Sequence, residues 1–245
     1  MGVCVIMLNR KVSKGIILAA GDGDRLGSLT RTHPKTLLLV NGIPLISHPI
    51  KALAAAQVRD IAIVVGYLKD TVSSSLGNGN SFGVRFVYIT NPDYLGGNAI
   101  SAYKAMEWAQ GQPVVLCMGD HIIEAEMVRR LLDQENLTET LCVDYAPASH
   151  HRVDEATKVT IDAGCIRDIG KDLVYWDALD TGIFLLTEDF FQALHELVRQ
   201  NGNDVEMSDV IRHLIRRGHP FDTCDVSGCF WMDVDTEEEL ELARI

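Results

Sequence analysis

A glycine-rich loop near the N-terminus carries cations at a spacing suited to binding phosphate groups. Gly21 and Gly23 follow the short apolar run 15–19. Because glycine has no Cβ, the backbone of such a loop can approach an anion and direct successive N–H groups at phosphate oxygens. Arg25 adds a planar fork of donors, and Lys35 adds a compact positive charge. The loop therefore predicts a polyphosphate site.

The common phosphate-binding motifs do not match this loop. A dinucleotide motif G-x-G-x-x-G would need glycine at position 26, where the chain has Leu26, and Gly27 comes one place late. A Walker loop would need Gly-Lys-Ser/Thr after four spacers, and no such triplet follows Gly21. A strand-to-helix turn that uses its glycines only for geometry remains an alternative for the loop taken alone.

Carboxylates in the second part of the chain are candidates for a metal site. Asp120 follows the apolar run 114–118, which would hold it on a rigid strand, and Asp233 lies in the segment FWMDVDTEEEL. Mg²⁺ prefers carboxylate oxygens and water, so we predict that Asp120 and Asp233 bind this ion. The alternative for Asp120 is a cap of the helix that follows it. We expect Asp235 to be the N-cap of the last helix.

The order of apolar runs predicts an α/β protein with a mostly parallel mixed sheet and helices on both faces. In such sheets ligands gather at the carboxyl ends of the strands, so the glycine loop and Asp120 should meet in space. The expected strands are 15–19, 61–65, 84–89 and 114–118, and the expected helices are 46–56, 70–76 and 99–109.

The second half of the chain has shorter strands and a different character, with Asp162-Ala163-Gly164 as a hairpin turn. One domain spanning 1–245 is the simplest account, with a nucleotide-binding half at about 15–135 and a β-rich acceptor-binding half at about 140–245. The expected strands are 141–145, 157–161, 165–169, 182–186, 221–225 and 229–234, and the expected helices are 188–200, 206–217 and one after Asp235.

The amino-acid composition limits the classes of partner that the protein can bind. The 245 residues carry a formal net charge of −12, and 47% of them are hydrophobic. Nucleic acids and anionic membranes bind basic surfaces, so this balance argues against both. An anionic substrate must then be held by a few individually placed cations and a metal, which makes each placed lysine and arginine more informative.

Cysteine usage and the N-terminus favour a cytoplasmic protein. The cysteines show no CxxC spacing, so free thiols explain them better than disulfides or zinc ligands. Residues 1–8 are apolar but lack the charged start and cleavage site of a signal peptide, and no transmembrane segment is found elsewhere. The six cysteines are Cys4, Cys117, Cys142, Cys165, Cys224 and Cys229.

The string LAAGDGDRLGSLTRTHPKTLLLVNGIPLI, residues 18–46, resembles the signature of the sugar-phosphate nucleotidyltransferase superfamily. One departure is the pair Asp22 and Asp24, where small or neutral residues would suit a triphosphate better. The resemblance implies a Rossmann-like fold of the nucleotide-diphospho-sugar transferase type, catalytic roles for Arg25, Lys35 and Asp120, and Mg²⁺ on Asp120 and Asp233. The nucleotide-binding residues that it implies are Leu18, Ala19, Ala20, Gly21, Asp22, Gly23, Arg25, Lys35, Gly97 and Asn98.

Further strings, YLGGNAISAYKA, MGDHII, DEATKVTID, IGKDL, WDALDTGIF and MDVDT, look most like the CTP:inositol-1-phosphate cytidylyltransferases. The substrates implied are CTP or another nucleoside triphosphate and a phosphorylated polyol such as inositol 1-phosphate, with CDP-inositol as product. In that family the cytidylyl domain is often fused to a membrane synthase, and the sequence allows a homo-oligomer. The acceptor-binding residues implied are Lys158, Lys171, Asp180, Thr181 and His121.

Ordinary structural roles, and other activities, are alternatives for these candidates. A lone lysine is usually exposed to solvent, Asp180 suits an ordinary turn, and Asn98 suits a helix cap as well as a pyrimidine edge. The rival activities are transfer to a sugar 1-phosphate or to phosphocholine. A non-catalytic regulatory or assembly domain is a rival of another class, but such a domain would be expected to lose Arg25, Lys35 or Asp120, and all are present.

Overall fold

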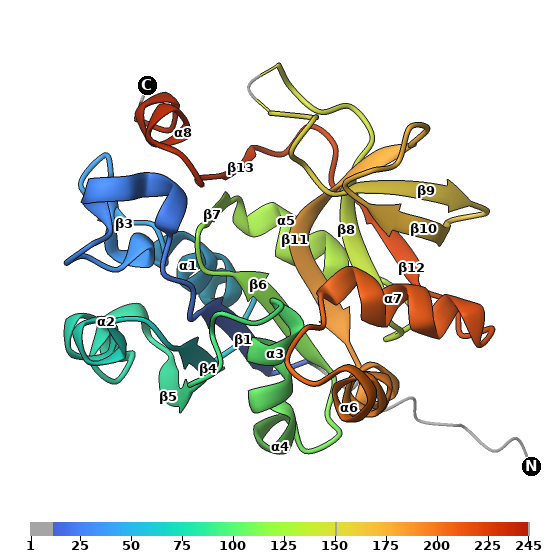
Figure 1. The fold of residues 1–245 in the computed structure, drawn as a ribbon, viewed down its shortest axis with the longest axis horizontal. Coiled ribbons are helices and arrows are strands. Elements are labelled where there is room, and N and C mark those ends of the chain that lie inside the picture. Colours follow the sequence, from blue (N-terminus) through green and yellow to red (C-terminus); the bar gives the residue numbers. More distant parts are fainter. Residues whose placement is uncertain (1–11, 150, 245) are drawn as a thin grey trace, which may run out of the picture.

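Parallel strands form one half of a nine-stranded sheet in the computed structural model, which describes residues 12–149 and 151–244 (Figure 1). These strands lie in the order β5 (Arg85–Thr90), β4 (Asp60–Val65), β1 (Lys14–Ala19) and β6 (Val114–Met118), and each pairs in parallel with its neighbour. The last three are largely buried and apolar, as in sheets covered by helices on both sides, whereas β5 is the edge strand and is partly exposed.

The other half of the sheet is mostly antiparallel, so the sheet is mixed as expected, but the expected predominance of parallel pairing is wrong. A tight turn at Ala163 and Gly164, both with positive φ, can join only antiparallel strands. The single parallel pair among the described residues of this half is β8 with β12. From β6 outward the order is β11 (Ala178–Leu186), β8 (Thr140–Asp144), β12 (Asp222–Asp225), β10 (Cys165–Gly170) and β9 (Lys158–Asp162).

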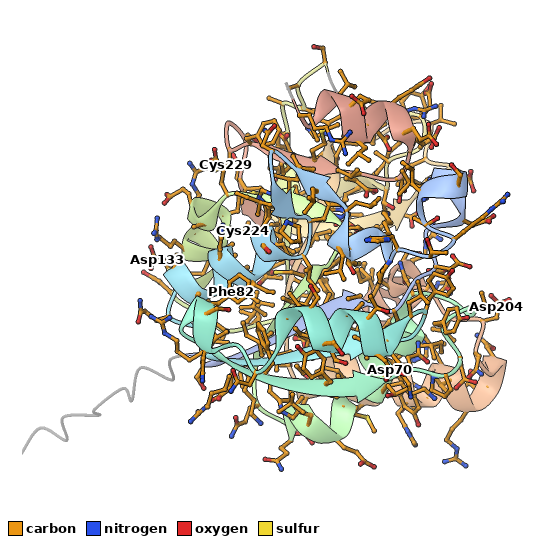
Figure 2. All side chains as sticks on the ribbon, turned by 90° about the vertical axis from the view of Figure 1, so that its left-hand side faces the viewer. Asp70, Phe82, Asp133, Asp204, Cys224 and Cys229 are labelled. Carbon is orange, nitrogen blue, oxygen red and sulfur yellow. The ribbon has the colours of Figure 1, made fainter. Side chains whose placement is uncertain are left out.

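Helices cover both faces of this sheet, as the alternation of apolar runs predicts. The two faces carry separate clusters of buried apolar side chains, and side chains fill the space between sheet and helices (Figure 2). One face packs against α1 (Ser47–Ala55), α2 (Lys69–Leu76) and α5 (Ala125–Leu132), and the other against α3 (Ala99–Lys104), α4 (Met106–Ala109), α6 (Glu188–Asn201) and α7 (Met207–Arg216).

Short elements outside the main sheet complete the fold. The strand expected at 229–234 is β13 (Trp231–Asp233), which pairs not with the main sheet but with β7 (His121–Ile123). A second two-stranded sheet joins β2 (Leu39–Val40) to β3 (Ile43–Pro44), and the chain ends in α8 (Glu237–Leu242). These elements gather at the carboxyl ends of the parallel strands, above β6 and β11 in Figure 1.

The cysteines in the described residues are free thiols. Cys117, Cys142 and Cys224 are buried, whereas Cys165 and Cys229 are half-buried; Cys4 and the apolar segment 1–8 lie outside the described residues. No helix in the described part of the chain is both long enough and apolar enough to cross a lipid bilayer.

Gly119 fixes how closely the ends of β6 and β1 approach. Its N–H donates to the carbonyl oxygen of Leu18 over 2.9 Å, and a Cβ at position 119 would lie 2.6 Å from that oxygen. This close approach places Asp120, the next residue, beside the glycine loop that follows β1.

We expect Gly119→Ala to lower the free energy of unfolding by about 1–3 kcal/mol, because the added methyl group must push two backbone segments apart. Gly21→Ala is the matched control, since a Cβ there meets no atom within 4 Å. Urea unfolding at one pH compares the variants. Equal stability of Gly119→Ala and wild type would show that this contact can relax.

Candidate active site

The glycine loop after β1 turns back sharply onto Lys35. Gly23 has φ 67°, in the left-handed region, and a Cβ at this position would lie 2.8 Å from the Cβ of Lys35. The Thr30 hydroxyl donates to the Gly23 carbonyl oxygen over 3.0 Å and fixes the turn from the other side. Gly23 is thus required both by the backbone conformation and by the packing of Lys35.

Lys35 lies between carboxylates at the base of this loop. It begins a short 3-10 helix, Lys35–Leu37, and its side chain is only 8% exposed. Its Nζ donates to Oδ2 of Asp120 over 2.6 Å and to Oδ1 of Asp235. Arg25 pairs with the other oxygen of Asp235 and lies 3.5 Å from Oε2 of Glu155. Residues 25, 35, 120, 155 and 235 therefore form one connected charge cluster.

The pairing of β7 with β13 brings Asp233 to Asp120. In this antiparallel pair Asp233 lies opposite His121, the residue after Asp120. His121 Nδ1 lies 3.0 Å from Oδ1 of Asp120 and 3.6 Å from Oδ1 of Asp233. The indole N–H of Trp231 donates to Asp144 over 2.9 Å and anchors β13 to β8. The two carboxylates predicted to share a metal are thus adjacent.

The charges of this cluster shift several pKa values. Burial would raise the pKa of Asp120, but Lys35 and His121 outweigh it and hold this pKa well below its usual range. Burial and the charge of Asp120 raise the pKa of Asp233 to about 7, against the opposing effect of His121. Burial alone would lower the pKa of His121, but Asp233 and Asp120 outweigh this effect and raise the pKa to about 9.

The donor atoms around Asp120 fit a hard divalent cation. One ligand atom each from Asp120, His121 and Asp233 lies within 4.8 Å of the others. Oδ1 of Asp233 is buried without a hydrogen-bond partner among the described residues, and a buried carboxylate oxygen in that state is costly unless a cation compensates it. Carboxylate oxygens suit Mg²⁺, and the imidazole of His121, which contacts Asp120, can orient that carboxylate.

An open pocket of about 610 Å³, counting space open to solvent, lies over the glycine loop. Of the predicted nucleotide-binding residues, Ala20 is buried with its carbonyl oxygen accepting the N–H of Tyr67, and it does not line this pocket. The lining residues are Leu18, Ala19, Gly21, Asp22, Gly23, Asp24, Arg25, Lys35, Thr36, Asp120 and Asp235.

Gly97 and Asn98, the other predicted nucleotide-binding residues, lie outside this lining. The N–H of Gly97 donates to the Asn203 carbonyl oxygen over 2.9 Å. The side-chain oxygen of Asn98 accepts the N–H of Met207, the first residue of α7, over 2.7 Å. The Asn98 side chain therefore ties the start of α7 to the loop before α3, and a role in contacting the base stays a prediction.

The predicted acceptor residues occupy different environments. His121 lies against Gly182, where a Cβ would be 2.9 Å from its ring, and Asp180 accepts the Gly182 N–H over 2.7 Å. Lys158 is buried and donates to the carbonyl oxygen of Lys171 over 2.7 Å, while the Lys171 side chain is exposed.

Thr181 is fully buried, and its hydroxyl donates to the Cys142 carbonyl oxygen over 2.9 Å. His121 and Asp180 are thus brought to the metal cluster, while the Thr181 hydroxyl is already used in the core.

The expected capping role of Asp235 is wrong. Thr236 is the N-cap of α8, and its capping box is completed by Glu239. The T-x-x-E pattern of a capping box is present in the sequence and identifies Thr236. The Asp235 side chain instead contacts Lys35 and Arg25. Sequence reasoning also missed Glu155, because an isolated glutamate in a loop carries no local signal.

A smaller pocket of about 420 Å³ adjoins the first one and shares Asp235 with it. Loop 151–156 forms one wall, with Arg152 paired to Glu155 over 2.6 Å. Asp233 and Trp231 from β13 form the other wall, and the His151 ring stacks on Trp231 with centroids 4.0 Å apart. Asp235 thus lies between two adjoining hollows, and Asp233 lines the smaller one.

Comparison with known proteins identifies the family to which the chain is similar. Residues 14–160 match the family described as nucleotidyl transferase. The chain is 34% identical over 229 residues to the "Bifunctional IPC transferase and DIPP synthase" of Rubrobacter xylanophilus, covering 93% of this chain and 50% of that protein. The Aquifex aeolicus protein of the same name is 32% identical over 233 residues, with 95% and 51% covered. The chain thus spans about half the length of these relatives.

The fold is also similar to solved structures. The "inositol-1-phosphate CTP transferase from T. maritima" superposes with a TM-score of 0.83, covering 95% of each chain at 21% sequence identity. At this identity the likeness establishes the fold alone, which is the mixed α/β fold described above.

Asp180 gives a prediction on stability. Burial raises its pKa to about 6, while the Gly182 N–H and His121 act in the opposite direction. The folded protein therefore binds this proton more tightly than the unfolded chain does, so stability falls as pH rises from about 4 to 6. Asp180→Asn should remove this loss. Above pH 6 the free energy of unfolding of this variant should exceed that of wild type by at most about 3 kcal/mol.

At about pH 3 the Asp180→Asn difference should nearly vanish, because Asp180 is then mostly protonated in both the folded protein and the unfolded chain. Chemical unfolding at about pH 3 and about pH 7.5 measures the two values. A variant less stable than wild type at pH 7.5 would show that the carboxylate is needed in its charged form.

Proposed function

This chain belongs to the nucleotidyl transferase family, and we propose that it is a CTP:inositol-1-phosphate cytidylyltransferase. The names of the Rubrobacter relative and of the T. maritima structure support this substrate pair. The observation that carries the proposal is the convergence of Arg25, Lys35 and Asp120 on one pocket, with Asp233 at its edge. Residues 15–135 would hold the nucleotide and residues 140–245 the acceptor.

The reaction needs no nucleophile from the protein. An oxygen of the acceptor phosphate, ionised near neutral pH, attacks the α-phosphorus of CTP in line. The new O–P bond forms as the bond from the α-phosphorus to the bridging oxygen breaks, and pyrophosphate leaves with the electron pair. Catalysis then rests on positioning and on neutralising the charge of the two anions.

Arg25 and Lys35 would bind the β- and γ-phosphates of the nucleotide. Both line the pocket over the glycine loop. Lys35 is held at its base, whereas the Arg25 side chain is 53% exposed and can close on a ligand. Backbone N–H groups of the loop around Gly21 would add neutral donors, which an acidic protein needs because it has few cations to spare.

Asp120 and Asp233 would hold Mg²⁺, the usual ion for phosphoryl groups. When bound, this ion neutralises phosphate charge and orients the reacting phosphates. His121 orients the Asp120 carboxylate through their 3.0 Å contact. Since Lys35 also contacts Asp120, the same carboxylate connects the nucleotide cations to the metal site.

The acceptor would bind on the side of His121 and Asp180, next to Asp233. His121 faces a phosphate as a donor, and Asp180 accepts from polyol hydroxyl groups. Lys158 is the first residue of β9, and Lys171 comes directly after β10. The Lys171 side chain is exposed and is therefore free to extend.

Release of pyrophosphate over a panel of substrates tests this function. CTP with inositol 1-phosphate should react at least about tenfold faster, in kcat/KM, than UTP, GTP or ATP with hexose 1-phosphates or phosphocholine. Each nucleotide without acceptor is the control for hydrolysis. A faster hexose reaction would refute the inositol assignment and leave the family intact, and no release with any pair would refute the activity.

Removal of either metal-site carboxylate tests the cofactor. Asp120→Asn and Asp233→Asn should each lower kcat about a hundredfold or more, the cost of losing one charge-stabilising contact of ~3 kcal/mol. Mg²⁺ should raise the Tm of wild type but not of these variants. Asp133→Asn is the control, because Asp133 is exposed at the end of α5 (Figure 2) and lines neither pocket of the site. Normal turnover by Asp120→Asn would remove it from the metal site.

A further inference from the structure

Asp235 bridges the two cations of the glycine loop. Its Oδ1 accepts from Nζ of Lys35, and its Oδ2 accepts from the guanidinium of Arg25. These contacts join segments 210 and 200 positions apart in the sequence. No sequence motif assigned this role to Asp235, which was expected to cap α8.

The carboxylate is itself held in place. The N–H groups of Asp235 and Thr236 both donate to Oε2 of Glu239 over 2.8 Å, within the capping box that starts α8. The Asp235 side chain is 15% exposed, and Glu239 is buried. Asp235 is therefore a fixed acceptor, whereas Arg25 is long and half-exposed.

The donors that remain free show what this arrangement does. A lysine ammonium has three N–H donors. On Lys35 one is taken by Asp120 and one by Asp235, so the position of the third is determined by the other two. Arg25 gives one end of its fork to Asp235, and the other end lies 3.5 Å from Glu155. Arg25 and Asp235 both line the pocket, so the donors of Arg25 that these contacts do not use can meet a ligand there.

Without a carboxylate between them, the two cations would repel each other, and Arg25 would lose a contact that orders its side chain. We propose that Asp235 is a positioning residue, which holds Arg25 and Lys35 converged on the pocket so that their remaining donors meet a polyphosphate. This inference rests on the proposed role of both cations in binding the nucleotide.

Binding of tripolyphosphate without metal tests the inference directly, with calorimetry as readout. Asp235→Asn keeps the shape of the side chain but cannot bridge two cations as a carboxylate does, and it should weaken binding about tenfold. Asp235→Glu, which restores the charge, should recover part of this loss. Glu237→Gln removes the same charge from an exposed position on α8 and should bind like wild type.

A double-mutant cycle with Arg25→Ala separates positioning from a general structural effect. If Asp235 acts through Arg25, Asp235→Asn should cost about tenfold in wild type but less than about threefold in the Arg25→Ala background. An equal cost in both backgrounds would overturn the inference. So would tighter binding by Asp235→Asn, which would mean that the carboxylate competes with phosphate.

Turnover separates this inference from the proposed function. Asp235→Asn should raise the KM for the nucleotide more than it lowers kcat, while a loss confined to kcat would contradict positioning. Absence of tripolyphosphate binding by wild type would overturn the inference. Absence of pyrophosphate release by wild type would overturn the proposed function, while the binding experiment would still decide the role of Asp235.

Discussion

The ion pairs of Lys35 are the interaction on which the rest of the site depends. A lysine that is 8% exposed must be paired, because an isolated charge is costly to bury. Its partners, Asp120 and Asp235, come from the end of β6 and from the segment before α8. The ammonium group of Lys35 therefore connects the parallel half of the sheet to the segment before α8. The Lys35 side chain also needs the space that Gly23 leaves by having no Cβ.

This pairing also allows an acidic protein to collect carboxylates at one place. Asp120, Asp233 and Asp235 lie close together, where mutual repulsion would otherwise oppose the fold. Lys35 and His121 offset part of this repulsion. The part that remains contributes to the pKa of Asp233, which burial and the charge of Asp120 raise to about 7. A carboxylate that is hard to ionise in the free protein is one whose charge a bound cation would restore.

The sequence predicts those parts of the site that depend on the parallel strands. The glycine loop and Asp120 follow β1 and β6, which are neighbours, so their convergence follows from the rule that ligands collect at the carboxyl ends of such strands. The strand pairing of the second half was harder to foresee. Hairpin turns such as the one at Ala163 and Gly164 favour antiparallel neighbours there, so parallel pairing does not predominate in the mixed sheet, contrary to expectation.

The position of Asp233 shows where such prediction ends. It reaches Asp120 through β7 and β13, which form a two-stranded sheet of their own. Strands this short have no measurable alternation, and nothing local pairs residue 121 with residue 233. The segment FWMDVDTEEEL, and then its resemblance to a family, predict Asp233 as a metal ligand. Only the fold shows which residues contact Asp235, because a contact between distant segments leaves no trace in either segment's pattern.

The two halves of the sheet differ in a way that matches their proposed tasks. The parallel half ends in a glycine loop with Lys35 at its base, and this loop would hold the polyphosphate common to all nucleoside triphosphates. The antiparallel half presents Asp180 from β11, beside His121 of β7, where substitution would alter the proposed acceptor site without disturbing the parallel core. The charged residues 120 and 233 come from the end of β6 and from β13, so the groups proposed to join two ligands also connect distant parts of the fold.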